Sequence, residues 1–342
     1  MAIQTVLGEI KKEKLGITLP HEHIYWDLRP VVDEPKTGLD VFYDKIRMDN
    51  RYLCYGDPYT ILDNAFLDNE DIAIRELELF KKAGGSTIVE VTLDDIKRDP
   101  LALKRVSEKT GVNIVMGCGH YIGASHSSDV EEKSERELAD EIVRDITVGA
   151  CGTDVKAGII GEIGTSAEIT KNEWKCLRAA GIASLETGKK IQVHTALYQE
   201  NGIPVLDELK SLGVSEDKVV IDHIDVVLRE DYLLKLLDRG AYVEFDNFGK
   251  EYYISSRGEG LLTGRFAYDL ERAKVVAKLI RMGYTKQILI TNDVCLKTMF
   301  TSYGGNGYAH ILNTVKTMLL DEGVTEEEFN TLMVSNCIDL LD

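Results

Sequence analysis

The sequence lacks the features that mark secreted, membrane-bound or disulfide-bonded proteins. Its first residues contain no apolar run followed by a small-residue cleavage site, which argues against a secretion signal. No stretch approaches the roughly 20 apolar residues that are needed to span a bilayer. Six cysteines are scattered along 342 residues without a CxxC pair, which is too sparse for a disulfide framework. These absences predict a cytoplasmic protein with reduced thiols and no membrane partner.

Positive charge is also scarce. The chain has 40 lysine and arginine residues against 58 aspartate and glutamate residues, a formal net charge of −18. Such an excess of carboxylates repels nucleic acid backbones and anionic lipid surfaces, so neither is expected as a partner. A small anionic substrate stays compatible with this charge, because a few lysines or metal cations can dominate one pocket.

No low-complexity linker and no shift of composition divides the chain, so we predict one domain over residues 1–342. Hydrophobic residues make up 44% and charged residues 29%, a globular balance with ample material for a core. Short apolar runs rich in valine and isoleucine recur eight times, as expected of parallel strands that are covered on both faces. The runs are residues 16–24, 85–92, 112–121, 156–164, 190–196, 217–225, 240–248 and 286–293.

Amphipathic patterns between these runs predict helices. They include residues 71–85, 134–149, 172–188, 228–240 and 266–283. Alternating β and α units favour an α/β fold, a closed (β/α)₈ TIM barrel, over an open doubly wound sheet. Long connections follow the first and seventh predicted strands, at residues 25–70 and 249–264. Loops after barrel strands form the catalytic face, so we expect these two to shape a pocket, with decorative insertions as the alternative.

Four of the seven histidines fall at the ends of predicted strands. His21 and His23 end the first strand, and residues two apart on a strand point to the same side. His194 and His223 end the fifth and sixth strands. Imidazole nitrogen binds zinc, manganese, iron or nickel, so this placement favours a metal site. For His21 and His23 taken alone, two side chains that face water are the alternative.

Two acidic residues belong to the same set. Glu162 lies on the fourth predicted strand, and Asp293 ends the eighth. An ionised carboxylate at the end of a buried strand needs a partner, because its desolvation alone is costly. A structural salt bridge explains either residue singly, whereas metal ligation explains both together with the histidines.

As an ordered set, these motifs resemble the phosphotriesterase-related family of the amidohydrolase superfamily, in its lactonase-like branch. They are HEH after ITLP, AGIIGEIGTS, VHT, DHID and the aspartate after ILITN, together with VEVTLDDIKRDP and YGGNGY. The resemblance runs over nearly the whole chain. It implies a distorted barrel with two divalent metals that are bridged by a carboxylate and a hydroxide. Zinc is the first choice, with manganese, iron, cobalt and nickel as alternatives, and a homodimer is the implied assembly.

The resemblance also assigns roles by position. The ligand set that it implies is His21, His23 and Asp293 for the more buried metal, and His194 with His223 for the more exposed one. Many members bridge the metals with a carboxylated lysine on the fourth strand, and Glu162 corresponds to the members that use glutamate. Asp293 is the implied catalytic residue, because it is placed to take a proton from the attacking hydroxide and pass it to the leaving oxygen.

Tyr121, Lys250 and Lys297 are the candidates for substrate contact. Tyr121 ends the third predicted strand and corresponds to a tyrosine that approaches the metal-bound oxygen in lactonase-like members, with a passive aromatic wall as the alternative. Lys250 and Lys297 follow the seventh and eighth strands, where each can bind a phosphate or carboxylate as a point charge. Solvated loop lysines are the alternative for both.

The predicted reaction is hydrolysis of a lactone or carboxylic ester, with a sugar-acid lactone as a candidate substrate. Relatives that act on sugar-lactone phosphates carry an arginine and a tyrosine where this chain has Leu296 and Met299, which weakens a phosphorylated substrate unless Arg257, Arg265 or Lys297 substitutes. A phosphotriesterase, an N-acyl amino acid amidohydrolase and a non-catalytic metal-binding protein are the alternatives.

Overall fold

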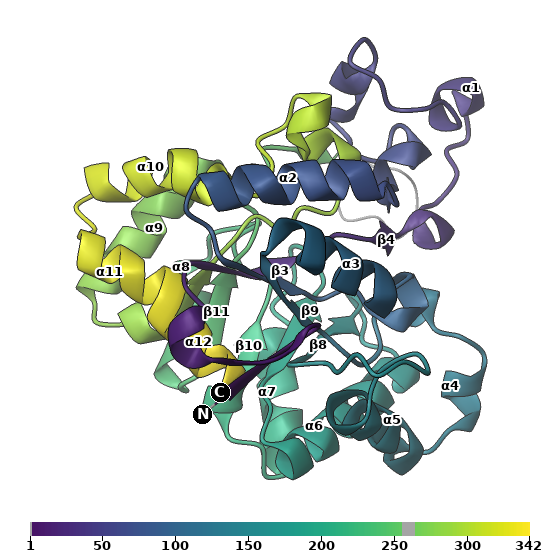
Figure 1. The fold of residues 1–342 in the computed structure, drawn as a ribbon, viewed down its shortest axis with the longest axis vertical. Helices are drawn as coiled ribbons and strands as arrows, with labels where there is room; N and C mark the ends of the chain where they lie inside the picture. The colour runs from purple at the N-terminus through teal and green to yellow at the C-terminus, as the bar shows by residue number, and fades with distance from the viewer. Residues whose placement is uncertain (1, 255–263) are drawn as a thin grey trace.

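The computed structural model describes residues 2–254 and 264–342 and forms an eight-stranded parallel β/α barrel (Figure 1). Hydrogen-bonded ladders join the strands in two arcs, in the orders β3-β6-β7 and β8-β9-β10-β11-β14. The barrel strands are β3 (Thr18–Glu22), β6 (Thr87–Glu90), β7 (Asn113–Met116), β8 (Ile160–Thr165), β9 (Ile191–Thr195), β10 (Val219–Ile221), β11 (Tyr242–Phe245) and β14 (Ile288–Ile290). Seven strands lie within the predicted runs, and β8 extends one residue beyond its run, to Thr165. The predicted TIM barrel is confirmed.

The two arcs are joined at irregular seams, which distort the barrel. Between β7 and β8, Gly161 N donates to Cys118 O at 2.8 Å. Between β14 and β3, the Glu22 carboxylate replaces ladder bonds, since it accepts from Asn292 N at 3.1 Å and from Val294 N at 2.6 Å. A buried carboxylate that accepts backbone donors satisfies groups that a regular ladder would otherwise pair. Glu22 therefore ties the end of β3 to the backbone on either side of Asp293.

Helices surround the barrel and follow its strands in turn. They are α2 (Glu70–Lys82), α3 (Pro100–Thr110), α4 (Asp129–Glu132), α5 (Glu135–Thr147), α6 (Lys171–Thr187), α7 (Gly202–Ser211), α8 (Glu230–Asp238), α9 (Asp269–Arg281), α10 (Lys316–Asp321) and α11 (Glu326–Asn330). Their boundaries follow local sequence signals. In α6, Thr170 and Glu173 form a capping box, and Gly188 ends the helix in the left-handed region at φ 76°. None of the described helices is long and apolar enough to cross a membrane.

The two ends of the chain close the same end of the barrel. The hairpin β1 (Ala2–Thr5) and β2 (Gly8–Lys11) pairs antiparallel, and α12 (Asn336–Leu341) packs beside it, as Figure 1 shows. Ile3 of the hairpin and Leu340 of α12 share one buried apolar cluster with Val89, Val220 and other strand residues. This packing seals the amino-terminal mouth, so that the carboxyl ends of the strands are left for a site.

The connection after β3 lies over the carboxyl-terminal face and projects beyond α2 and α3 in Figure 1. It contains β4 (Trp26–Asp27), α1 (Leu39–Phe42) and β5 (Phe66–Leu67). After β11, the short strands β12 (Tyr253–Ile254) and β13 (Gly264–Arg265) pair antiparallel. Arg257 lies outside the described residues. That the whole chain is one domain stays a prediction.

Candidate active site

Six side chains from five strands converge at the carboxyl end of the barrel, with Glu162 at their centre. Three imidazole nitrogens surround Glu162 Oε2: His21 Nε2 at 3.5 Å, His194 Nδ1 at 3.1 Å and His223 Nε2 at 3.5 Å. His23 Nε2 lies 3.2 Å from Glu162 Oε1 and also 3.2 Å from Asp293 Oδ1. Three overlapping groups of these residues place one ligand atom each within 4.8 Å of one another. The six residues that the sequence singled out therefore lie around one small volume.

Three of the central atoms are buried without a hydrogen-bond partner among the described residues. They are His21 Nε2, Glu162 Oε1 and Asp293 Oδ1. A buried polar atom without a partner is costly, and native proteins rarely leave one unexplained. Imidazole nitrogens and carboxylate oxygens that face one centre are the donor set of a divalent transition-metal site. The residues present thus fit the pair of metal ions that the resemblance implies.

Backbone geometry at two of the six positions is unusual. His223 has φ 60° and Asp293 has φ 46°, in the left-handed region that residues other than glycine rarely adopt. Each such residue costs about 1–3 kcal/mol and persists only where the surrounding structure holds it. His223 lies two residues beyond the end of β10 and Asp293 three residues beyond the end of β14, where the left-handed turn directs their side chains to the centre.

A second layer of contacts orients three of the histidines. His21 Nδ1 lies 3.0 Å from Glu244 Oε2, His23 Nδ1 lies 2.8 Å from Thr92 Oγ1, and His223 Nδ1 lies 3.0 Å from Asp246 Oδ1. Each contact holds the outer ring nitrogen, so that Nε2 faces the centre, as in carboxylate–histidine–metal triads. Sequence reasoning missed these partners. The signal that could have found Glu244 and Asp246 is two acidic residues alternating within the buried run VEFDNF.

The support of His223 continues into helix α9 through buried polar groups. Asn247 Nδ2 donates to Asp246 Oδ1 and to Asp225 Oδ1, each at 2.6 Å. Asp225 in turn pairs with Arg272 of α9 at 2.9 Å, and Arg272 pairs with Asp269 at 3.1 Å. Arg272 is fully buried. The position of His223 is therefore tied to a network that crosses from the strand ends to the outer helix.

Electrostatics keep the two central carboxylates ionised. Burial alone would raise the pKa of Glu162, but the imidazoles of His21, His194 and His223 outweigh burial and hold it well below its usual value. Burial also acts to raise the pKa of Asp293, where the Lys250 ammonium and the imidazoles of His23 and His21 reverse the effect and lower it. Both groups are thus charged acceptors at neutral pH, as ligation of a cation requires.

Five of the six side chains, all except His21, border a cavity of about 90 Å³. Tyr121 lines it, and its hydroxyl lies 3.2 Å from His194 Nδ1. Lys250 also lines it, and its ammonium contacts Asp293 Oδ2. Apolar and aromatic side chains form most of the remaining wall. They include Trp26, Leu28, Tyr59, Leu197, Tyr252, Ile254, Phe266 and Leu296. The structure therefore brings two of the three predicted substrate contacts to the cluster of candidate metal ligands.

The third predicted contact, Lys297, does not reach this cavity. Its ammonium pairs with Asp63 Oδ1 at 2.9 Å and borders a separate hollow near Phe300 and Tyr303. Asp63 is buried in the connection after β3, so it needs a cation, and Lys297 supplies one. Arg265 likewise pairs with Glu271 at 2.9 Å near the surface. Neither residue supplies the phosphate contact considered from the sequence.

Comparison with known proteins decides the family. Residues 1–341 match the model of the phosphotriesterase family. The chain belongs to the phosphotriesterase family. It is a hydrolase, and this family depends on a binuclear metal centre. Which metal this protein binds stays a prediction. The recognition made from the motifs is confirmed.

Similar proteins align with 96–100% of this chain. A protein from Dictyostelium discoideum named N-acetyltaurine hydrolase is 36% identical, and the alignment covers 98% of this chain and 96% of that protein. The structure is similar to a resiniferatoxin-binding protein from Rhodobacter sphaeroides, at TM-score 0.95 and 34% identity over 100% of this chain and 95% of the other. It is also similar to the phosphotriesterase homology protein of Escherichia coli with phosphate in its active site, at TM-score 0.80 and 27% identity over 96% and 99%.

Proposed function

We propose that this protein hydrolyses the amide bond of a small N-acylated amine that carries an acidic group, with N-acetyltaurine as the model compound. The observation that carries the proposal is the contact of Lys250 with Asp293 inside the cavity that five of the six candidate ligands border. The name shared by curated relatives that align with 98% of the chain supports the same substrate class. Amides therefore move ahead of the lactones and esters that the sequence placed first.

The metal sites are part of this proposal. His21, His23, Glu162 and Asp293 would hold one divalent cation, with zinc as the first choice. Glu162 would share its carboxylate with the second cation, which His194 and His223 complete. Unpartnered buried atoms on three of these residues support the assignment. When bound, such a pair of cations supplies a Lewis acid for the scissile carbonyl and lowers the pKa of the attacking water.

The chain's own residues account for the proton transfers. Asp293 lines the cavity between the other candidate ligands and Lys250, so its carboxylate is placed to accept the proton of the attacking water. The C–O bond then forms, and the C–N bond breaks only as the leaving nitrogen takes up a proton. Asp293 can return the proton to that nitrogen, and the adjacent Lys250 ammonium holds the carboxylate in place through Oδ2. The products are a carboxylic acid and a free amine.

Lys250 also fits an acidic substrate. Among the described residues, it is the one lysine or arginine that lines the cavity of about 90 Å³ beside the candidate ligands, which we call the catalytic cavity. An ammonium group carries three donors, so its contact with Asp293 leaves capacity for a sulfonate or carboxylate of the substrate. The apolar wall around it excludes water, which strengthens that attraction. This arrangement supports a compact anionic substrate over a bulky neutral one.

Hydrolysis of a lactone or carboxylic ester is the second candidate. Tyr121 favours it, because its hydroxyl lies beside His194 where it can contact the carbonyl oxygen of a ring ester. An ester needs less protonation of its leaving group than an amide. It therefore depends less on the proton transfer assigned to Asp293 and Lys250.

A substrate panel separates the candidates. The metal-loaded protein is assayed for kcat/KM with N-acetyltaurine, N-acetyl amino acids, sugar and aliphatic lactones, and a paraoxon-type phosphotriester. We expect the highest kcat/KM for an N-acyl amide with an acidic group, and loss of turnover after chelation of the metals. Efficient lactone turnover without amide turnover would reject the proposal in favour of the second candidate.

A further inference from the structure

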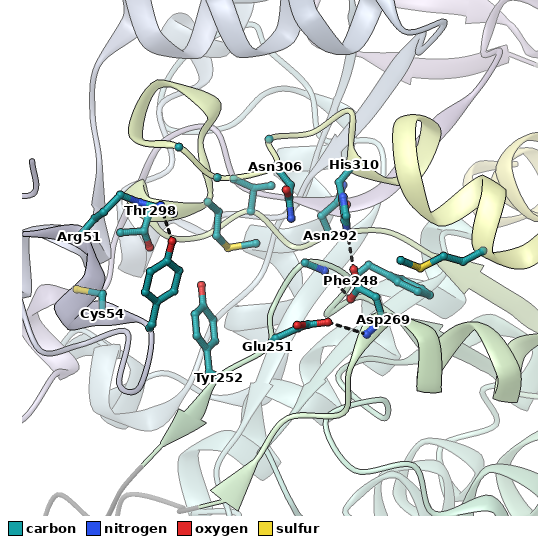
Figure 2. Close-up of a pocket in the computed structure, with 18 residues that line it drawn as sticks. Arg51, Cys54, Phe248, Glu251, Tyr252, Asp269, Asn292, Thr298, Asn306 and His310 are labelled. Carbon is teal, nitrogen blue, oxygen red and sulfur yellow. Dashed lines mark hydrogen bonds and ion pairs between the residues drawn. The ribbon is translucent and has the colours of Figure 1, made fainter. Parts of the chain in front are cut away.

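A second cavity lies beside the catalytic cavity and is larger, at about 460 Å³ (Figure 2). Three connections line it, and the lining residues from them include Arg51, Cys54, Tyr55, Phe248, Gly249, Glu251, Tyr252 and residues 304–307. Tyr252 lines both cavities, so the segment that carries Lys250 forms the wall between them. In the part of the chain that the structure describes, none of the six candidate metal ligands borders this second cavity. It is therefore a separate chamber, and the proposed reaction assigns it no role.

The second cavity presents a buried acceptor without a partner. Asn292 lines it and is 1% exposed. The amide nitrogen of Asn292 donates to Glu22 Oε1 at 3.1 Å and to Tyr308 O at 3.3 Å, which fixes the orientation of the side chain. Its Oδ1 has no hydrogen-bond partner within residues 2–254 and 264–342. A buried amide oxygen left unpaired is unfavourable, so this atom calls for a ligand that donates a hydrogen bond.

Charges of both signs border the second cavity. Arg51 is the one arginine or lysine along its described lining, and it stacks on Tyr55 at 4.9 Å from the ring centroid. The Nε atom of Arg51 is buried and lacks a hydrogen-bond partner among the described residues. Glu251 supplies a carboxylate, which accepts from Asp269 N at 3.3 Å. Figure 2 shows Arg51 on one side of the cavity, with Glu251 and Asn292 on the other.

The remaining carboxylate and imidazole of the lining, Asp269 and His310, are already paired with each other. Asp269 accepts from Gly249 N at 2.8 Å, lies 2.6 Å from His310 Nε2, and pairs with Arg272 at 3.1 Å. Gly249 has φ +88°, and a Cβ atom there would lie 3.3 Å from His310 Cδ2, so the glycine allows this close approach. Paired groups make a rigid wall and leave Arg51 and Glu251 as the charges available to a ligand.

We propose that this second cavity binds a small zwitterion, whose compact anion pairs with Arg51 and whose ammonium group donates to Glu251 and to Asn292 Oδ1. Phe248 and Met299 supply apolar contact for the carbon chain between the two charged groups. A ligand with a single charge would leave either Arg51 or Glu251 without its partner. Under the proposed function, the amine released from N-acetyltaurine is itself such a zwitterion, so the cavity suits the product of the neighbouring reaction. Binding does not depend on that function.

Titration calorimetry on the metal-loaded full chain tests the site with β-alanine and taurine, and with propionate and ethylamine as singly charged controls. We expect the zwitterions to bind more tightly than either control. Arg51→Gln should weaken their binding about tenfold or more, because it removes a charge-assisted contact. Glu251→Gln should weaken it as well. Arg47→Gln is the matched control, because Arg47 lies in the same connection and pairs with Asp44 outside the cavity.

Two results would overturn the site. One is no binding of either zwitterion to the wild type. The other is wild-type affinity in both Arg51→Gln and Glu251→Gln, because the zwitterion would then occupy the catalytic cavity only. A thermal unfolding control shows whether Arg51→Gln folds. If it does not fold, Glu251→Gln still tests the site, because Glu251 is exposed and its replacement should leave the fold intact. A failed amide assay leaves the β-alanine titration interpretable, which separates this inference from the proposed function.

Discussion

Replacing Arg272 by methionine should destabilise the protein strongly, because it leaves buried carboxylates without their cation. The Arg272 side chain has 0% exposure and pairs with Asp225 at 2.9 Å and with Asp269 at 3.1 Å. Breaking a buried ion pair from one side costs about 3–5 kcal/mol. Native domains are stable by about 5–15 kcal/mol, so the variant should lose a large share of its free energy of unfolding.

Urea unfolding followed by circular dichroism measures this loss on the metal-loaded protein. Arg105→Met is the matched control, because the Arg105 side chain is 52% exposed and pairs with Glu70 at 2.9 Å. A surface pair of this kind contributes about 0–1 kcal/mol. The double variant Arg272→Met with Asp225→Asn should regain part of the loss, since it removes one of the unpaired charges. A loss in Arg272→Met no larger than that in Arg105→Met would refute the reasoning.

The same variant should also weaken metal binding. Asp225 holds Asn247, Asn247 holds Asp246, and Asp246 orients His223. Contacts of this kind that orient a ligand typically contribute about 10–100-fold to metal affinity. Competition with a chelator measures the affinity of the folded variant below its unfolding transition. Unchanged affinity would show that His223 does not depend on the network.

Three further outcomes follow from single contacts. Lys250→Met should lower kcat by about 10²–10⁴-fold with its metal content retained, because it removes the cation from Asp293, and a wild-type kcat would contradict that role. Lys297→Met should keep the wild-type kcat and KM, because Lys297 pairs with Asp63 away from the catalytic cavity, and a large rise in KM would return it to the substrate contacts. Burial, aided by His126 and Lys133, lowers the pKa of His120 to about 4. Since the unfolded pKa is about 6.5, the resulting stability of about 3 kcal/mol is present above pH 6.5 and is lost as pH falls toward 4. His120→Gln should therefore flatten urea-unfolding stability over that interval, and a profile as steep as that of the wild type would contradict the assignment.

The barrel was predictable because its signals are local. Buried parallel strands read as short valine- and isoleucine-rich runs, and the helices between them carry amphipathic patterns and caps such as Thr170 with Glu173. Candidate ligands were found for a related reason. The carboxyl ends of barrel strands share one face, so His21, His194 and His223 could be grouped although they lie far apart in the sequence.

Contacts between distant segments were not predictable. Lys297 was grouped with the substrate contacts because it follows Asp293 closely, whereas its partner Asp63 lies in a connection without a periodic pattern. Arg272 lies in a helical pattern where an arginine is usually solvated, and only the fold brings it to Asp225. The second cavity is built from three separate connections, so its shape follows from tertiary packing alone.

Metal stoichiometry tests the central claim most directly. Metal-free protein is titrated with zinc, and bound metal per chain is measured by elemental analysis after desalting, for the wild type and for His194→Asn. Convergence of the six side chains on two cations predicts two equivalents for the wild type and loss of one equivalent when His194 is replaced. A wild type that holds no tightly bound metal, or a His194→Asn variant that keeps both equivalents, would contradict it.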